Sequence, residues 1–173
     1  METWDIYDIN RLKTGRTAQR GWGKLEKGDY HLVVHICIFN SKGEMLIQQR
    51  QPFKDSWPNV WDITVGGCAI SGDSSQKAAE RELFEELGYK IDLTDTRPHL
   101  TLNFKAGFDD YYLIEDDVEI DKLKLQQEEV QQVKWASKDE ILELIENGEF
   151  IPYYKDLIAL LFEMRRGFGS HTR

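Results

Sequence analysis

Three glutamates, Glu82, Glu85 and Glu86, are spaced so that their carboxylates could act together. In a helix, residues i, i+3 and i+4 are surface neighbours, with Cβ atoms about 5–6 Å apart. Like charges on one face repel, so the spacing favours a bound cation, and Mg²⁺ takes carboxylate oxygens together with substrate phosphates. The residues therefore predict metal-assisted cleavage of a phosphate compound. The alternative is a solvated acidic face, because this repulsion costs only about a few tenths of a kcal/mol per pair.

The helix that must position these acids has its own sequence pattern. Asp73 or Ser74 can act as the N-cap, and Gly88 is suited to the residue just after the last turn. Arg81 precedes Glu85 by four residues, which allows an i,i+4 ion pair that orients the glutamate. A stripe at helical spacing is predicted to face the core: Ala79, Leu83 and Leu87. One face would thus anchor the helix while the adjoining face directs its acids into a cleft.

The segment from Gly67 to Tyr89 resembles the Nudix box, in which a glycine is followed at fixed spacing by an Arg-Glu-apolar-x-Glu-Glu-x-Gly-apolar string. All fixed positions but one match, and Asp73 stands where the family has glutamate. The substitution keeps the charge and shortens the side chain. The matching residues are Gly67, Arg81, Glu82, Leu83, Glu85, Glu86, Gly88 and Tyr89.

The resemblance implies a role for each matched residue. Glu85 and Glu86 match the principal metal ligands, the carbonyl of Gly66 matches a backbone ligand, and Glu82 matches a ligand or general base. Arg81 is expected to orient the glutamates. Glycine at 66 and 67 suits close approach of backbone to metal and phosphate.

Further residues extend this expected site. The Nudix resemblance also implies a further acid from a later loop, with Glu128 or Glu129 as candidates, although both could simply be exposed. Arg50 could contact a phosphate or be an ordinary surface arginine, and Gly67 is expected beside the substrate. The expected cofactor is Mg²⁺ or Mn²⁺, and the expected substrate is a nucleoside diphosphate joined to another group.

Composition favours one domain over residues 1–173, a length that can bury a core. The net charge of −9, from 22 basic and 31 acidic residues, argues against binding a nucleic acid polymer or an anionic membrane. The first residues lack a secretory signal pattern, and two cysteines do not form a disulfide framework. We expect a cytoplasmic enzyme, with a homodimer as an open possibility.

Hydrophobic patterning predicts the elements around the glutamate helix. Together they favour an α/β class with a mixed sheet sandwiched between helices, which is the α/β/α arrangement that the Nudix resemblance also implies. Strands are predicted at 4–9, 30–40, 44–50, 60–65, 97–106, 110–115 and 130–135, with a polar loop at 11–28 and further helices at 137–146 and 153–166.

Two other function classes compete with hydrolysis. Residues 31–61 resemble the isopentenyl-diphosphate-isomerase branch of the superfamily, and His31 stands where the isomerases have a histidine ligand. Those enzymes carry a catalytic cysteine before the box glycine and a histidine after it, whereas this chain has Gly66 and Cys68. The glutamate series, incomplete in isomerases, is complete here, which favours a hydrolase from the isomerase-like branch. A non-catalytic binding module would typically have lost those glutamates.

Overall fold

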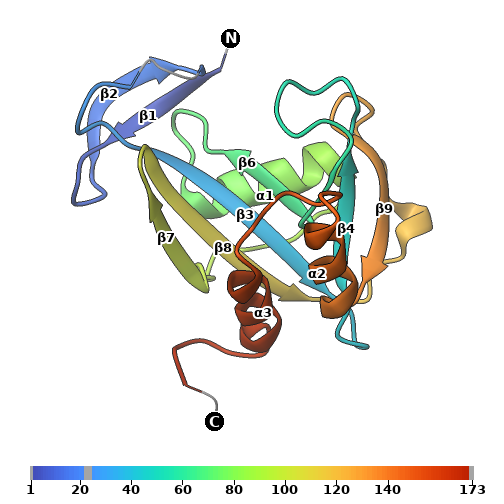
Figure 1. The fold of residues 1–173 in the computed structure, drawn as a ribbon. Coiled ribbons are helices and arrows are strands. Elements are labelled where there is room, and N and C mark those ends of the chain that lie inside the picture. The colour runs from blue at the N-terminus through green and yellow to red at the C-terminus, as the bar shows by residue number, and fades with distance from the viewer. Residues whose placement is uncertain (1, 22–24, 172–173) are drawn as a thin grey trace.

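The computed structural model describes residues 2–21 and 25–171. A mixed sheet lies between helices on its two faces (Figure 1). Its strands pair in the order β5-β4-β3-β8-β7, while β6 also pairs with β3 and β9 with β4. The strands of this sheet are β3 (His31–Phe39), β4 (Met45–Arg50), β5 (Trp61–Asp62), β6 (Val65–Cys68), β7 (Leu100–Phe104), β8 (Gly107–Glu115) and β9 (Val130–Ala136).

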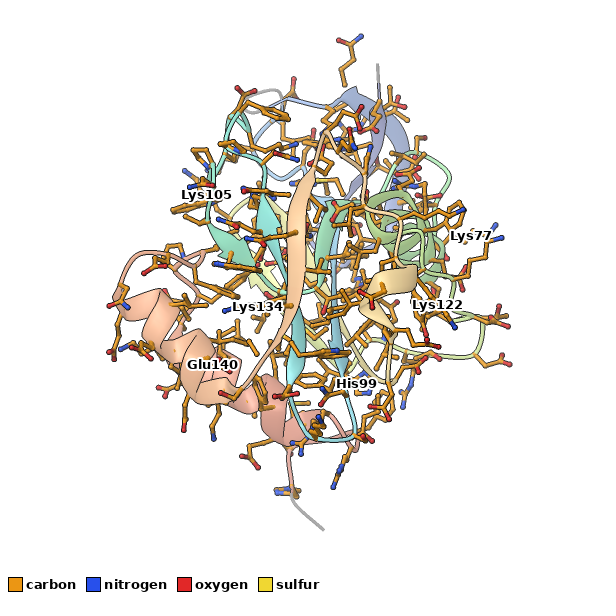
Figure 2. The ribbon with its side chains drawn as sticks, turned by 90° about the vertical axis from the view of Figure 1, so that its right-hand side faces the viewer. Lys77, His99, Lys105, Lys122, Lys134 and Glu140 are labelled. Carbon is orange, nitrogen blue, oxygen red and sulfur yellow. The ribbon has the colours of Figure 1, made fainter. Side chains whose placement is uncertain are left out.

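The three α-helices cover opposite faces of the sheet. Helix α1 (Ser75–Leu87) packs its apolar stripe on one face, and α2 (Lys138–Glu146) and α3 (Lys155–Met164) pack on the other. A view turned by 90° shows α1, marked by Lys77, and α2, marked by Glu140, on opposite sides of the strands (Figure 2). The predicted α/β/α sandwich is therefore confirmed. A short 3₁₀ turn, Ile120–Lys122, was not predicted.

The central pair of the sheet is β3 and β8, which run parallel in register from His31↔Gly107 to Phe39↔Glu115. Strand β3 alternates between the two cores: Val34 and Ile36 face α1, whereas Cys37 and Phe39 face α2 and α3. This alternation follows from the period of two in a strand. It fixes which side chains can reach the glutamates.

The N-terminal residues form a separate hairpin of β1 (Thr3–Tyr7) and β2 (Lys13–Gln19). The prediction of a loop at 11–28 was wrong for β2. Its side chains are mostly exposed on both faces, so it lacks the apolar alternation that marks a half-buried strand. Asp5 ties the hairpin to the turn before α1, accepting from the hydroxyl of Ser71 at 2.7 Å and the amide of Gly72 at 3.0 Å.

The strand predicted at 60–65 is divided into β5 and β6, because the chain crosses there from β4 to β3. Thr64 lies at the crossing, fully buried. Its hydroxyl donates to the carbonyl of Leu46 at 2.5 Å and accepts from the amide of Ile38 at 2.9 Å. The side chain thus replaces backbone pairing where β3 and β4 separate. The strands predicted at 97–106 and 110–115 are joined by a turn at Lys105 and Ala106, so that β8 begins at Gly107.

Candidate metal and phosphate site

Helix α1 is fixed at both ends and along one face. The hydroxyl of Ser74 caps the first turn by accepting from the amide of Lys77 at 3.2 Å. Gly88 ends the helix with φ of 66°, and its amide donates to the carbonyl of Phe84 at 2.9 Å. The predicted stripe is fully buried, so the register of the helix is set by packing: Ala79, Leu83 and Leu87. The glutamates are therefore held at fixed angles around α1.

Arg81 joins the glutamates to the glycine-bearing loop. Its guanidinium contacts Glu82 at 2.9 Å and Glu85 at 3.0 Å, so the predicted i,i+4 ion pair is present. It also contacts Asp73 at 3.2 Å and donates to the carbonyl of Cys68 at 3.0 Å. These carboxylates raise the pKa of Arg81 despite its partial burial. Asp73 thus supports Arg81 and the loop, whereas the capping hydroxyl belongs to Ser74.

Glu86 is the most unusual acid of the helix. Its side chain is buried, and among the described residues its one hydrogen bond comes from the amide of Gln48, at 2.7 Å to Oε2. The ionisable groups that act on it most are further acids, Glu82, Glu129 and Asp62. Burial raises the pKa of Glu86 to about 8 and also raises the pKa of Glu82. A buried acid surrounded by acids is held at a cost that a bound cation would offset.

The glycine pair of β6 leaves room for Glu82. A Cβ added at Gly67 would lie 2.2 Å from the carboxyl carbon of Glu82, so a side chain there would force the Glu82 carboxylate to move. At Gly66 the added atom would lie 3.0 Å from Nδ1 of His35. The backbone at Gly67 therefore lies directly against the carboxylate of Glu82.

Within the described ranges, no three His, Cys, Asp or Glu side chains are grouped as a ready-made metal cage. The contacts explain this arrangement, because Arg81 bonds to Glu82 and Glu85 while Glu86 points to Gln48. The donors nevertheless fit a hard divalent cation, which binds oxygen ligands. Glu85 is about half exposed and free to rotate away from Arg81. Glu82 and Glu86 would be the further carboxylates available beside it on α1.

Two other predicted site residues have partners of their own. Arg50 donates to the carbonyl of Ser56 at 3.2 and 3.1 Å, and its guanidinium lies 3.8 Å from the buried Asp62. Glu129 forms an ion pair with Lys54 and acts electrostatically on Glu86. Arg50 therefore helps to hold the loop after β4, and Glu129 is the candidate later acid that is coupled to the helix. Glu128 instead lines a separate surface pocket of about 690 Å³.

Gln48 and Asp62 belong to this site and were not predicted. Both are buried, and the hydroxyl of Tyr153 donates to Asp62 at 2.9 Å. Gln48 had a signal in the sequence, since it is a polar residue that directly follows the apolar run Met45–Ile47 in a strand. The pairing of Gln48 with Glu86, 38 positions away, had no signal in the sequence.

A family model described as the NUDIX domain matches residues 29–157. The chain belongs to the Nudix family. A Nudix hydrolase of Listeria innocua is 48% identical over 171 residues, covering 99% of both chains. An isopentenyl-diphosphate Delta-isomerase of Pectobacterium atrosepticum is 30% identical over 156 residues, covering 83% of each. The predicted Nudix family and the predicted similarity to its isomerase members are confirmed. The chain is a Nudix hydrolase.

Solved structures agree with this family assignment. The crystal structure of DR0079 from Deinococcus radiodurans superposes with a TM-score of 0.74 at 26% identity, over 94% of this chain and 98% of that one. A MutT protein of Methanosarcina mazei shares the fold, with a TM-score of 0.58 at 20% identity over 83% of this chain and 99% of that one. Nudix hydrolases act on small-molecule substrates and generally use divalent metal ions.

Proposed function

We propose that this Nudix hydrolase cleaves a diphosphate linkage in a nucleoside diphosphate joined to another group, and that it requires Mg²⁺ or Mn²⁺. One observation carries the proposal. Glu86 is buried beside other acids, with the amide of Gln48 as its one hydrogen-bond partner in the described part of the chain. A divalent cation would compensate that charge and attract the anionic substrate to an acidic protein.

Each residue has a role in this proposal. Glu82, Glu85, Glu86 and the carbonyl of Gly66 would hold the cation, and Glu129 is the proposed later acid. Arg81 would keep the carboxylates in position from its anchor on Asp73. When bound, the cation would neutralise phosphate charge and lower the pKa of water. Glu82 or Glu85 would accept the proton of the attacking water. Gly67 would let a phosphate approach the backbone, and Arg50 is proposed to contact it.

The position and protonation of Cys68 and His31 make the isomerase alternative weaker. Cys68 follows the box glycine, and burial raises its pKa to about 11, which keeps the thiol protonated. His31 is stacked on Trp4 at 4.3 Å, and burial lowers its pKa. A neutral histidine can bind a metal, so the relationship to an isomerase keeps this second candidate testable. A non-catalytic module is disfavoured by the intact glutamate series.

A phosphate-release screen tests the proposal. Wild-type protein is incubated with Mg²⁺ or Mn²⁺ and ADP-ribose, dinucleoside polyphosphates, nucleotide sugars, nucleoside triphosphates and nucleoside diphosphates. The matched variants are Glu85→Gln and Glu163→Gln, which removes an exposed acid on α3. We expect turnover by wild type and Glu163→Gln and loss with Glu85→Gln. Equal turnover by Glu85→Gln would contradict the proposal, and isomerisation of an intact diphosphate would support the alternative.

Three broader predictions accompany this function. We propose that residues 1–173 act as one domain, since Asp5 attaches the N-terminal hairpin to the turn before α1. The helices in the described part of the chain are too short or too polar to cross a membrane. A cytoplasmic location and a homodimer stay predictions.

A further inference from the structure

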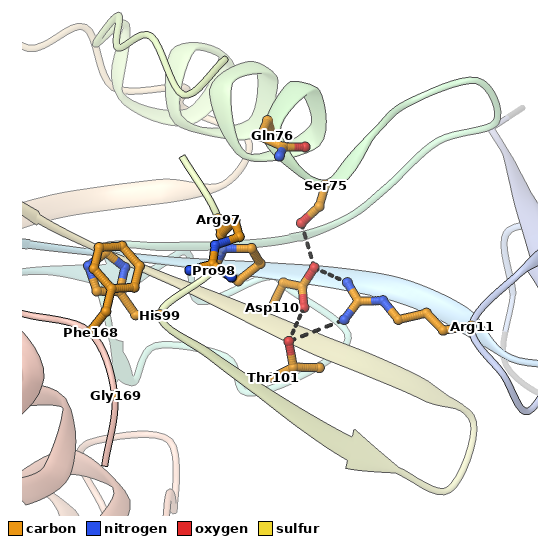
Figure 3. Close-up of a pocket in the computed structure, with 10 residues that line it drawn as sticks. All are labelled: Arg11, Ser75, Gln76, Arg97, Pro98, His99, Thr101, Asp110, Phe168 and Gly169. Atoms are coloured by element: carbon orange, nitrogen blue, oxygen red, sulfur yellow. Dashed lines mark hydrogen bonds and ion pairs between the residues drawn. The ribbon is translucent and has the colours of Figure 1, made fainter. Parts of the chain in front are cut away.

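A pocket of about 560 Å³ lies at the β7 edge of the sheet, beside the start of α1. Gln48, the partner of Glu86, lies in β4, which pairs with β5 and β9 toward the other edge of the sheet. Figure 3 shows that the pocket walls come from segments far apart in sequence. The residues that matter most are Arg11 from the N-terminal hairpin, Arg97 and His99 from the segment before β7, Asp110 from β8, and Phe168 near the C-terminus.

Among the described residues that line this pocket, Asp110 is the one acid, and its carboxylate is bonded to neighbouring groups. Asp110 is buried and accepts hydrogen bonds from the hydroxyls of Ser75 and Thr101, each at 2.6 Å, and forms an ion pair with Arg11. Tyr112 donates to the hydroxyl of Ser75 at 2.8 Å and closes the network. Asp110 thus holds Arg11 in place and neutralises one of the two arginines.

Arg97 is the uncompensated charge of the pocket. Its side chain has no hydrogen bond or ion pair with any residue in the ranges 2–21 and 25–171, and it is exposed. With Arg11 and Arg97 against Asp110, the pocket carries a net positive charge in a protein of net charge −9. Guanidinium groups bind phosphate oxygens in a planar, paired geometry. The charge of the pocket therefore favours a phosphate-bearing anion.

His99, two residues after Arg97, and Phe168 form an aromatic platform in the pocket. The ring of Phe168 stacks on His99 with centroids 3.9 Å apart and planes 17° apart, and Phe168 remains 54% exposed. Nδ1 of His99 accepts from the amide of Leu113 at 3.2 Å, and burial lowers the histidine pKa. The neutral ring therefore carries its proton on Nε2 as a donor. A stacked pair with one exposed face suits a planar heterocycle.

We propose that this pocket binds a nucleoside monophosphate, with its phosphate on Arg97 and Arg11 and its base stacked on Phe168. The volume lies within the range of small-molecule sites, about 300–1,000 Å³. The site is separate from Glu82, Glu85 and Glu86, and the proposal does not depend on the hydrolase mechanism. It gives the protein a second place at which a nucleotide, as product or effector, is recognised.

The test is isothermal titration calorimetry on full-length protein in excess EDTA, with AMP, adenosine and orthophosphate as separate ligands. We expect AMP to bind, adenosine not to bind, and orthophosphate to bind more weakly than AMP. Arg97→Gln should weaken AMP binding about tenfold or more, because it removes the charged contact. Phe168→Ala should weaken AMP by about tenfold and leave orthophosphate unchanged. Arg166→Gln, a neighbouring arginine paired with Glu115, is the matched control.

An NMR readout locates the ligand. The amide of Leu113, hydrogen-bonded to His99, should shift on addition of AMP in wild type and in Glu85→Gln, and should not shift in Arg97→Gln. No AMP binding by wild type, equal affinity for AMP and orthophosphate, or unchanged affinity in Arg97→Gln would each overturn the proposal. Loss of AMP binding in Glu85→Gln would place the ligand at the glutamates and overturn it as well.

Discussion

Replacing Glu86 with glutamine should stabilise the metal-free protein at alkaline pH. Burial raises the pKa of Glu86 to about 8, whereas a glutamate in an unfolded chain titrates near about 4.3. Between these values the folded protein binds a proton that the unfolded chain has released. The contribution of Glu86 to stability is therefore fully present below about pH 4 and is lost as the pH rises to about 8.

The magnitude follows from the difference between the two pKa values. It corresponds to at most about 5 kcal/mol of folding free energy. The hydrogen bond from Gln48 lowers the pKa and is already included in the raised value. Glutamine keeps the size of the side chain and carries no charge. We therefore expect the variant to lie within about 1 kcal/mol of the wild type near about pH 5 and to exceed it by about 2–5 kcal/mol near about pH 9.

Urea unfolding of both proteins in EDTA, across that pH range, measures the difference directly. The difference between variant and wild type isolates Glu86, because other titrating groups are common to both. Glu163→Gln is the matched control, because it removes an acid that lies exposed on α3 instead of buried. A Glu86→Gln effect that stays constant from about pH 5 to about pH 9 would refute the reasoning. Added Mg²⁺ should stabilise the wild type at alkaline pH and the variant much less.

Three other changes test the surroundings of the helix. Gly67→Ala should lower kcat at least about tenfold while the protein stays folded, because the new methyl displaces Glu82. The control Gly167→Ala meets nothing within 4 Å and should be neutral. Equal rates for the two variants would contradict the close packing of Gly67 against Glu82. Arg81→Lys should lower the free energy of unfolding, measured in urea, by about 2–3 kcal/mol. The reason is that lysine cannot bond at once to the four partners of Arg81, which are Asp73, Glu82, Glu85 and Cys68. A loss below about 0.5 kcal/mol would contradict the anchoring role. Glu129→Gln should lower the rate of phosphate release with little change in stability. Glu128→Gln should leave that rate unchanged. An unaltered rate in Glu129→Gln would exclude Glu129 as the later acid.

Local sequence determined what could be predicted about α1. An N-cap at Asp73 or Ser74, the glycine at 88 and the buried stripe depend on residues within one or two turns of each other, so their spacing predicts them. The structure decides that Ser74 is the cap. The ion pair of Arg81 with Glu85 has the same origin. The apolar strands β3 and β4 were predicted because burial leaves a pattern in composition.

Other features depend on partners that sequence spacing does not reveal. Strand β2 forms through backbone pairing with β1. It has no buried face that would leave an apolar pattern in the sequence. The division between β5 and β6 rests on Thr64 bonding to two strands at once. The burial of Glu86 against Gln48 unites residues from α1 and β4, and only the folded structure reveals that this glutamate differs from Glu85.

Anomalous X-ray diffraction from crystals soaked in Mn²⁺ tests the central claim most directly. The account predicts a peak bounded by the carboxylates of Glu82, Glu85 and Glu86 and the carbonyl of Gly66, with metal–oxygen distances near about 2.1 Å and Glu85 turned away from Arg81. A crystal that binds Mn²⁺ elsewhere, with Glu86 still bonded to Gln48 and no peak beside it, would contradict the account.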